Sequence, residues 1–211
     1  MKTALVAGAS GLVGSSLVKM LLQEQEYGAV HILVRKEIEL THEKLHQNVV
    51  DFDNLATTNF DFKVDDAFVT LGTTITKAGC KSAFYKVDHD YVILFAQKAL
   101  SLGAMGIFVV SSMGANPRSS IFYNKVKGEM EEDMKALGFP RLGIFRPSLL
   151  LGPRTEKRKG EKIASWMMQT LDFVIPAKYK TIHVDKVARK MIELALQNEN
   201  GLIILESDKL Q

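Results

Sequence analysis

Residues 3–14, TALVAGASGLVG, place a glycine-rich turn between a β-type run and a helical run. Residues 3–7 are mostly apolar, and LVGSSLVKMLLQ at 12–23 repeats apolar side chains at helical spacing. Glycines in such a turn allow a tight bend and a close backbone approach to a pyrophosphate, which the helix N-terminus binds through free N–H groups. The stretch therefore predicts a dinucleotide-binding turn made of Gly8, Ala9, Ser10, Gly11, Leu12, Val13 and Gly14.

The same alternation continues outward along the chain. Further strands are expected at 29–34, 49–50, 67–69, 106–110, 142–146 and 202–205, with helices at 83–102, 120–137 and 184–196. Helices between strands imply parallel pairing, and continuous apolar runs suit a sheet buried on both faces. We expect an α/β fold of Rossmann type, doubly wound, with a mostly parallel sheet of about seven strands. The whole chain, 1–211, is expected to form one domain, with 152–180 as a small, irregular C-terminal excursion on the substrate side.

Composition limits the class of protein. The chain has 211 residues, of which 46% are hydrophobic and 24% charged, as in soluble globular proteins. A net charge of +3 is too small to predict nucleic-acid binding, and no apolar run is long enough to predict a membrane span. One cysteine, Cys80, allows no internal disulfide, so we expect a cytoplasmic protein. The expected partner is a small molecule, and the expected assembly is a monomer or a homodimer.

The residues after the second expected strand bear on cofactor choice. NAD sites usually place Asp or Glu there to bind the ribose 2′-hydroxyl, whereas this chain has Arg35 and Lys36. A guanidinium can pair with a 2′-phosphate in bidentate fashion. The alternative is that both are ordinary solvated loop charges. We expect NADP, as NADPH, to be the cofactor.

A second constellation follows the strand at 106–110. That strand ends at Ser111 and Ser112, and the helix that follows carries Tyr123 and Lys127 one turn apart. A free tyrosine has a pKa near 10, so it needs a nearby cation to exchange protons near pH 7. A serine hydroxyl at the strand end could hold a carbonyl oxygen during hydride transfer. Alone, a Tyr-x-x-x-Lys pair is common by chance, but after this glycine turn it predicts an oxidoreductase site.

At this point the chain resembles the short-chain dehydrogenase/reductases, in particular the atypical branch of Tat-interacting-protein-like oxidoreductases. The resemblance covers nearly the whole chain through GASGLVG, HILVRK, LGTT at 71–74, KVDHDYV at 86–92, VVSSMGA, YNKVK and FRPSLLLGPR. It implies that Tyr123 is the proton donor, that Lys127 also holds the nicotinamide ribose, and that Ser111 or Ser112 binds the oxyanion. Further cofactor contacts implied by the resemblance are Leu71, Gly72, Thr73 and Thr74, Asp51 and Phe52 near the adenine, and Pro147, Ser148, Leu149 and Leu150 along the nicotinamide.

The chain also departs from the family pattern. Asp88 stands where many members have an asparagine, which puts a proton relay there in doubt. The region after Leu150 is short compared with that of sugar-nucleotide epimerases, which argues against a bulky nucleotide-sugar substrate.

One motif points to different chemistry. His42 and His46 belong to HEKLH, which matches the H-E-x-x-H zinc peptidase pattern. That pattern binds zinc only on a helix, and here it falls in the short connection between the second and third expected strands. We interpret it as a polar connection.

The sequence thus predicts an NADPH-dependent oxidoreductase that reduces a carbonyl of a small substrate by a Ser-Tyr-Lys mechanism. The alternative is an NADPH-binding regulatory or sensor protein with little or no turnover. Fold alone does not fix the substrate.

Overall fold

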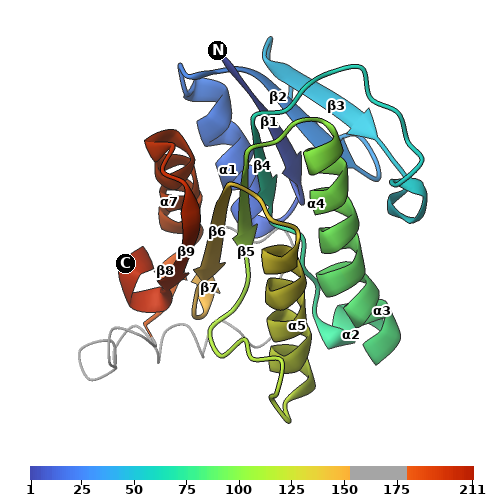
Figure 1. Ribbon diagram of the computed structural model, residues 1–211, viewed down its shortest axis with the longest axis vertical. Helices are drawn as coiled ribbons and strands as arrows, with labels where there is room; N and C mark the ends of the chain where they lie inside the picture. The colour runs from blue at the N-terminus through green and yellow to red at the C-terminus, as the bar shows by residue number, and fades with distance from the viewer. Residues whose placement is uncertain (153–179) are drawn as a thin grey trace.

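The computed structural model describes residues 1–152 and 180–211 and contains a seven-stranded sheet in the order β3-β2-β1-β4-β5-β6-β9 (Figure 1). Every neighbouring pair of strands in this sheet is parallel. A smaller sheet pairs β7 with β8, also in parallel. The doubly wound α/β fold expected from the sequence is confirmed.

The elements have the following bounds. The main strands are β1 (Lys2–Ala7), β2 (Tyr27–Val34), β3 (Leu45–Val49), β4 (Asp66–Val69), β5 (Gly106–Val110), β6 (Arg141–Arg146) and β9 (Gly201–Glu206). The longer helices are α1 (Leu12–Gln23), α4 (Tyr91–Ser101), α5 (Phe122–Ala136) and α7 (Val184–Gln197). The short elements are η1 (Phe52–Asn54), α2 (Ile75–Ala78), α3 (Lys81–Tyr85), η2 (Lys86–Asp90), β7 (Leu150–Leu151), β8 (Ile182–His183) and η4 (Ser207–Leu210).

Helices cover both faces of the sheet, with α1 and α7 on one face and α4 and α5 on the other (Figure 1). Successive residues of a strand point to opposite faces, so each strand feeds two cores. Val6 and Ile32 are buried in the core under α1 and α7, whereas Leu5 and Leu33 are buried in the core under α4 and α5. This explains why the strands are apolar nearly throughout.

The long helix expected at 83–102 is interrupted. It consists of α3, the π-helical turn η2 and α4 in direct succession. π-Helical turns are rare and occur often at functional sites. This one contains two buried polar residues, Asp88 and His89.

Other boundaries also differ from expectation. The third strand was expected at 49–50. The structure has it as β3, which begins four residues earlier, and its sequence LHQNV has three polar residues in the middle. The pair β7 and β8 was not predicted, because two-residue strands have no readable periodicity. The irregular excursion expected at 152–180 lies outside the described residues except for its two end residues.

A buried charge cluster ties together the amino ends of four strands. Asp66, which is fully buried at the start of β4, accepts hydrogen bonds from Lys2 Nζ at 3.1 Å, Tyr27 Oη at 2.7 Å and Arg141 Nη2 at 2.8 Å. Burial and the neighbouring Asp66 charge raise the pKa of Tyr27 well above its ordinary value. The cluster joins β1, β2, β4 and β6 at one edge of the sheet.

The opposite edge contains the switch point of the fold. β1 is followed by β2 on one side and has β4 as its other neighbour, so the order of strands reverses beside β1. In sheets of this kind ligands bind outside the carboxyl ends of the strands at this point. The glycine turn after β1 lies there.

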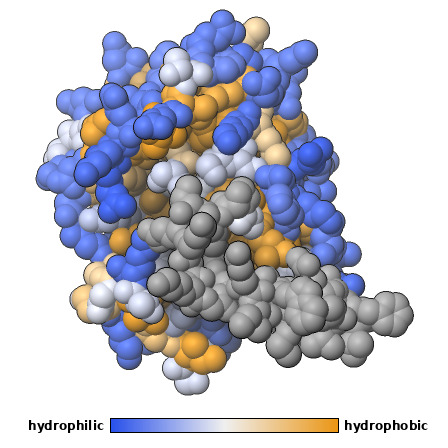
Figure 2. Space-filling view, turned by 180° about the vertical axis from the view of Figure 1, so that it is seen from behind, coloured by the Kyte–Doolittle hydropathy of each residue, from blue (hydrophilic) through white to orange (hydrophobic). Residues whose placement is uncertain are grey.

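Seen from behind, the described surface has hydrophilic residues along its outline and hydrophobic residues gathered between them (Figure 2). Within the described ranges, every helix is too short or too polar to cross a bilayer.

Candidate active site

The glycine turn is shaped by close contacts with β4. Gly8 has a φ of +90°, and a Cβ atom at this position would come within 2.6 Å of the Thr70 carbonyl carbon. Gly11 donates its backbone N–H to the Gly8 carbonyl at 2.9 Å, which closes the turn. Thr70 in turn donates its hydroxyl to Ala7. Only glycine fits at position 8.

The third glycine brings α1 against this turn. A Cβ atom on Gly14 would lie 2.1 Å from the Gly8 carbonyl oxygen. Gly11 caps the helix without a side-chain hydrogen bond, so the first backbone N–H groups of α1 have no partner within the helix. Of the other predicted turn residues, Ala9 and Val13 are buried, Leu12 is half-buried and Ser10 is exposed. A turn of this shape fits a pyrophosphate.

Two cations follow β2 beside the glycine turn. Arg35 and Lys36 are exposed, and neither forms an ion pair or a hydrogen bond with another described residue.

Asp51 and Phe52 follow β3. The exposed carboxylate of Asp51 accepts hydrogen bonds from the backbone of Asp53 at 3.0 Å and from the side chain of Asn54 at 2.8 Å. Phe52 is buried, with its ring centroid 5.4 Å from that of Tyr91. Both side chains thus already have structural contacts within the protein.

The LGTT turn follows β4. Leu71 and Thr73 are half-buried, and Gly72 and Thr74 are exposed. Thr74 caps α2 by accepting the backbone N–H of Lys77 at 3.1 Å. Thr73 donates its backbone N–H to Asp88 Oδ2 at 2.8 Å, which connects this turn to η2.

Helix α5 carries Tyr123 and Lys127 on one face. Tyr123 is half-buried, with its ring centroid 5.6 Å from that of Phe84, whereas Lys127 is buried. Gly128 lets the helix approach the preceding loop, because a Cβ there would lie 2.2 Å from the Asn116 carbonyl carbon. The fold thus holds Tyr123 and Lys127 one turn apart, as the sequence predicts.

The Lys127 ammonium faces a carboxylate. Lys127 Nζ lies 2.7 Å from Asp88 Oδ1, and both side chains are almost fully buried. Sequence reasoning had marked Asp88 only as a departure from the family pattern. Asp88 stands in the largely polar stretch KVDHD, with Asp90 two residues on, so the sequence carried no signal that one of these acids is buried.

The two serines after β5 have different surroundings. Ser111 donates its hydroxyl to Glu131 Oε1 at 2.5 Å. Arg146 holds the same carboxylate through two hydrogen bonds, and this contact raises the pKa of Arg146. Ser112 is buried, and its hydroxyl has no hydrogen-bond partner within the described part of the chain. Glu131 and Arg146 were missed by sequence reasoning, because their pairing joins positions fifteen residues apart.

The segment after β6 runs beside these serines. The Pro147 carbonyl accepts the backbone N–H of Met113 at 3.0 Å, and Ser148 donates its hydroxyl to the Lys180 carbonyl. Pro147 is buried, Leu149 is exposed, and Leu150 belongs to β7. Thus the fold brings this segment to the edge that also carries the glycine turn and the serines.

The HEKLH motif does not form a helix. His42 precedes β3, and His46 lies on it, with its ring centroid 4.6 Å from that of His31. A helical zinc motif is therefore absent at these residues.

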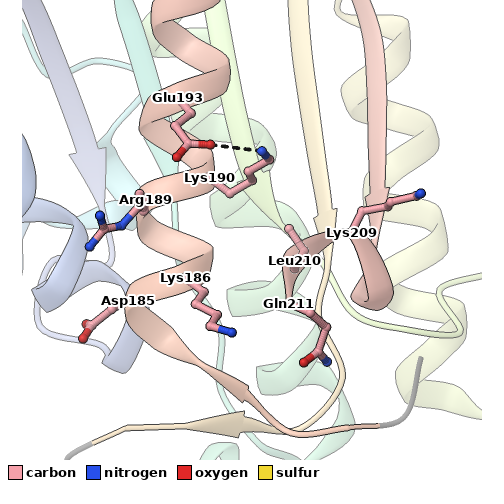
Figure 3. Close-up of a pocket in the computed structure, with 8 residues that line it drawn as sticks. All are labelled: Asp185, Lys186, Arg189, Lys190, Glu193, Lys209, Leu210 and Gln211. Carbon is pink, nitrogen blue, oxygen red and sulfur yellow. Dashed lines mark hydrogen bonds and ion pairs between the residues drawn. The ribbon is translucent and has the colours of Figure 1, made fainter. Parts of the chain in front are cut away.

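A separate hollow of about 390 Å³ lies between α7 and the C-terminal turn η4 (Figure 3). Its lining contains an ion pair between Lys190 and Glu193 at 3.0 Å. The remaining lining residues are Asp185, Lys186, Arg189, Lys209, Leu210 and Gln211. None of them belongs to the predicted cofactor or catalytic residues.

Comparison with known proteins agrees with this geometry. The NAD dependent epimerase/dehydratase family matches residues 4–103. The chain is 34% identical to the protein HTATIP2 of Rattus norvegicus over 99% of its own length and 87% of that protein. It is 32% identical to FMP52 of Eremothecium gossypii, over 98% of its own length and 95% of that protein.

The names of these relatives correct one expectation. FMP52 of Eremothecium gossypii and of Candida glabrata is named as a mitochondrial protein, so the expected cytoplasmic location is wrong. The expectation failed because one free cysteine excludes an internal disulfide without specifying a compartment.

Solved structures share the fold. A short-chain dehydrogenase family protein of Francisella tularensis has a TM-score of 0.73 at 17% identity, covering 99% of this chain and 98% of that one. The enzyme WbmH of Bordetella bronchiseptica, solved with NAD+, has a TM-score of 0.74 at 16% identity, covering 98% of this chain and 76% of that one. With the sequence identity to HTATIP2 and FMP52 over nearly its full length, the chain belongs to their family, an atypical branch of the NAD(P)-binding short-chain dehydrogenase/reductases.

Proposed function

We propose that this protein is an NADPH-dependent oxidoreductase that reduces the carbonyl group of a small substrate. One observation carries the proposal: Ser112 has a buried hydroxyl without a partner among the described residues, at the sheet edge where α5 presents Tyr123 and Lys127. A buried polar group without a partner is costly, and a ligand oxygen would satisfy it.

The glycine turn supports a dinucleotide as the cofactor. Gly8 and Gly14 leave no room for side chains, so the backbone can lie directly against a pyrophosphate. The N–H groups that begin α1 would bind its oxygens. Ser10, which is exposed in this turn, would lie beside the phosphates.

The preference for NADPH over NADH rests on Arg35 and Lys36. Both are exposed after β2 and have no partner among the described residues, and the residue that follows Val34 is not an acid. A guanidinium binds a 2′-phosphate in bidentate fashion, and a carboxylate in its place would repel that phosphate.

In the proposed reduction, the cofactor supplies the hydride and three side chains bind the carbonyl oxygen, donate the proton and stabilise the phenolate. A bound nicotinamide supplies the hydride, which forms the new C–H bond at the carbonyl carbon. Ser112 donates a hydrogen bond that holds the carbonyl oxygen, and Tyr123 transfers its phenolic proton to that oxygen. Lys127, one turn from Tyr123, stabilises the resulting phenolate through its positive charge. The products are an alcohol and the oxidised cofactor.

Of the two serines, we assign the carbonyl contact to Ser112. The hydroxyl of Ser111 is donated to Glu131, whose carboxylate also binds Arg146. The role of Ser111 is to hold α5 against the end of β5. The different partners of Ser111 and Ser112 support this assignment, for which the sequence alone gives no preference.

A second candidate function is a nicotinamide-binding regulatory protein with little turnover. The ion pair between Lys127 and Asp88 favours it, because a neighbouring carboxylate reduces the stabilisation that Lys127 gives to a phenolate. Tight NADPH binding without reduction of any carbonyl in a broad panel would support this candidate.

The deciding experiment is a titration of the purified protein with NADPH and NADH, followed by nicotinamide fluorescence. The proposal expects NADPH to bind at least about tenfold more tightly, equivalent to about 1.4 kcal/mol. Arg35→Asp should remove this preference, whereas Lys19→Asp, on the exposed side of α1, should leave it unchanged. Failure of the wild type to bind either nucleotide would refute both candidate functions.

A further inference from the structure

Large apolar side chains are exposed on three segments that follow neighbouring strands of the sheet. Ile75 comes after β4, Ile121 lies between β5 and α5, and Leu149 comes after β6, with exposed fractions of 39%, 60% and 50%. Because β4, β5 and β6 are adjacent and parallel, these segments all lie at the carboxyl edge (Figure 1). The same edge carries Ser112 and Tyr123, the proposed carbonyl-binding and proton-donating residues.

A single exposed apolar residue is ordinary, but Ile121 also occupies a position that disfavours it. Its carbonyl accepts the first backbone hydrogen bond of α5, from Lys125 at 2.9 Å, so Ile121 is the N-cap residue of this helix. Side chains that accept a hydrogen bond are preferred there, and Ile121 provides no side-chain cap. The chain thus exposes an apolar group where a polar one would stabilise the helix.

The position of Ile121 relative to the phenol of Tyr123 is set by the fold. Ser119 Oγ accepts the Ile121 backbone N–H at 3.1 Å. The two residues after Ile121 both pack against Phe84 of α3, with ring centroids 5.8 Å away for Phe122 and 5.6 Å away for Tyr123. A side chain held in this way can select a ligand, because its place is fixed before the ligand binds.

Leu149 is held beside the serine loop by backbone contacts. Its carbonyl accepts the N–H of Ile182 at 2.9 Å, where β8 begins. Two residues earlier, the Pro147 carbonyl accepts the N–H of Met113, which directly follows Ser112, at 3.0 Å. The exposed side chain of Leu149 therefore lies on a segment that is bonded to the loop carrying Ser112.

A ligand at this edge would meet two kinds of group. The buried hydroxyl of Ser112 has no partner among the described residues and would be satisfied by an oxygen atom. Ile121 and Leu149 offer apolar surface, and ligand sites commonly combine such surface with a few polar groups that fix orientation. A carbonyl group attached to an aliphatic chain has both features.

We propose that the carbonyl substrate carries an aliphatic chain, which Ile121 and Leu149 bind beside Ser112 and Tyr123. The inference rests on the proposed function, since it names the substrate class of the same site. It makes Ile121 a specificity-determining residue, whose apolar side chain is kept at the cost of a helix cap.

The test compares two series of ligands of increasing chain length. With NADPH, kcat/KM should rise about threefold for each methylene added from butanal through hexanal to octanal. Butanamide, hexanamide and octanamide present a carbonyl oxygen but are not reduced by hydride transfer, so their binding reports recognition alone. Calorimetry in the presence of NADPH should show their dissociation constants falling by the same factor per methylene.

Ile121→Ser separates ligand binding from packing within the protein. It should weaken octanamide binding about fivefold and flatten the dependence of kcat/KM on chain length. Its urea midpoint should be no lower than that of the wild type, because serine is a favourable N-cap residue. Leu149→Ser should flatten the same dependence, which keeps the test open if Ile121→Ser fails to fold.

Met105→Ser provides the matched control. Met105 is 55% exposed and directly precedes β5, so it lies at the amino edge of the sheet. This variant should keep the wild-type dependence on chain length in both series. An equal flattening in Met105→Ser would mean that the loss of any exposed apolar group has this effect, and it would overturn the inference.

The outcomes separate the inference from the proposed function. If no aldehyde is reduced but amide affinity rises with chain length and falls in Ile121→Ser, the reductase is refuted and the apolar site is supported. Aldehydes reduced with equal kcat/KM along the series, together with equal amide affinities, overturn the inference alone. A urea midpoint lower in Ile121→Ser than in Met105→Ser would place Ile121 in the packing of the protein and would also overturn it.

Discussion

Ser111 donates a hydrogen bond to Glu131 Oε1 across 2.5 Å, and Arg146 donates to both oxygens of the same carboxylate. Arg146 also reaches Glu206 on β9 at 2.8 Å. The interaction therefore fastens α5, β5, β6 and β9 together at the carboxyl edge of the sheet. Two adjacent serines thus differ in availability, since the hydroxyl of Ser112 is left without a partner among the described residues.

This difference gives opposite expectations for two alanine variants. Ser112→Ala should lower kcat/KM about a hundredfold by removing a hydrogen bond to the carbonyl oxygen, with little effect on the melting temperature. Ser111→Ala should cost about 1–3 kcal/mol of unfolding free energy, because Glu131 loses a buried donor. Steady-state kinetics and urea unfolding of both variants would check this, and the reverse pattern would transfer the carbonyl contact to Ser111.

Tyr123→Phe separates chemistry from binding. The phenylalanine ring preserves packing against Phe84 but cannot supply a proton. Turnover should fall about 10² to 10⁴-fold, while the dissociation constant of NADPH changes less than about twofold. Stopped-flow measurement of nicotinamide oxidation would test this expectation. Full activity in the variant would exclude Tyr123 as the proton donor.

Gly14 and Gly11 should respond differently to alanine. A Cβ on Gly14 meets the Gly8 carbonyl oxygen at 2.1 Å, whereas on Gly11 the same oxygen is 3.2 Å away. Overpacking of this kind costs about 1–3 kcal/mol, so Gly14→Ala should lose at least that much unfolding free energy and Gly11→Ala clearly less. Urea unfolding of the two variants measures the difference. Equal losses would contradict the observed packing of α1.

His31 should make stability depend on pH. Burial, together with the neighbouring His46, lowers the pKa of His31 to about 4 from its ordinary 6.5. The unfolded chain therefore binds this proton more readily, so stability is complete above pH 6.5 and is lost as the pH falls toward 4.

Because His31 is only half-buried, we expect a loss of about 1 kcal/mol between pH 7 and pH 5. His31→Gln should reduce the pH dependence by that amount, as measured by urea unfolding at both values. An unchanged dependence would show that other groups produce it.

The sequence was most informative where the deciding contacts are local. The glycine turn and the Tyr123–Lys127 pair depend on spacing within one turn or one helix, and the fold positions both as expected. The parallel sheet followed from apolar strands alternating with helices, because a sheet covered on both faces must be apolar on both.

Features made by distant contacts could not be predicted in this way. The distinction between Ser111 and Ser112 depends on Glu131, twenty residues away, and on Arg146 from another strand. β3 was misplaced because an edge strand can contain polar residues such as His46 and Gln47. The location of the protein depends on recognition by the cell, which a cysteine count does not report.

The buried cluster around Asp66 bears on where amino-acid substitutions can alter binding without unfolding this protein. At the amino ends of the strands its members are hydrogen-bonded to one another, whereas Arg35 and Ser112 at the carboxyl ends have no hydrogen-bond partner among the described residues. Substitutions at the carboxyl ends can therefore alter what is bound while the scaffold remains folded. Directed evolution toward new substrates should accordingly find its beneficial variants at one end of the strands and its loss-of-folding variants at the other.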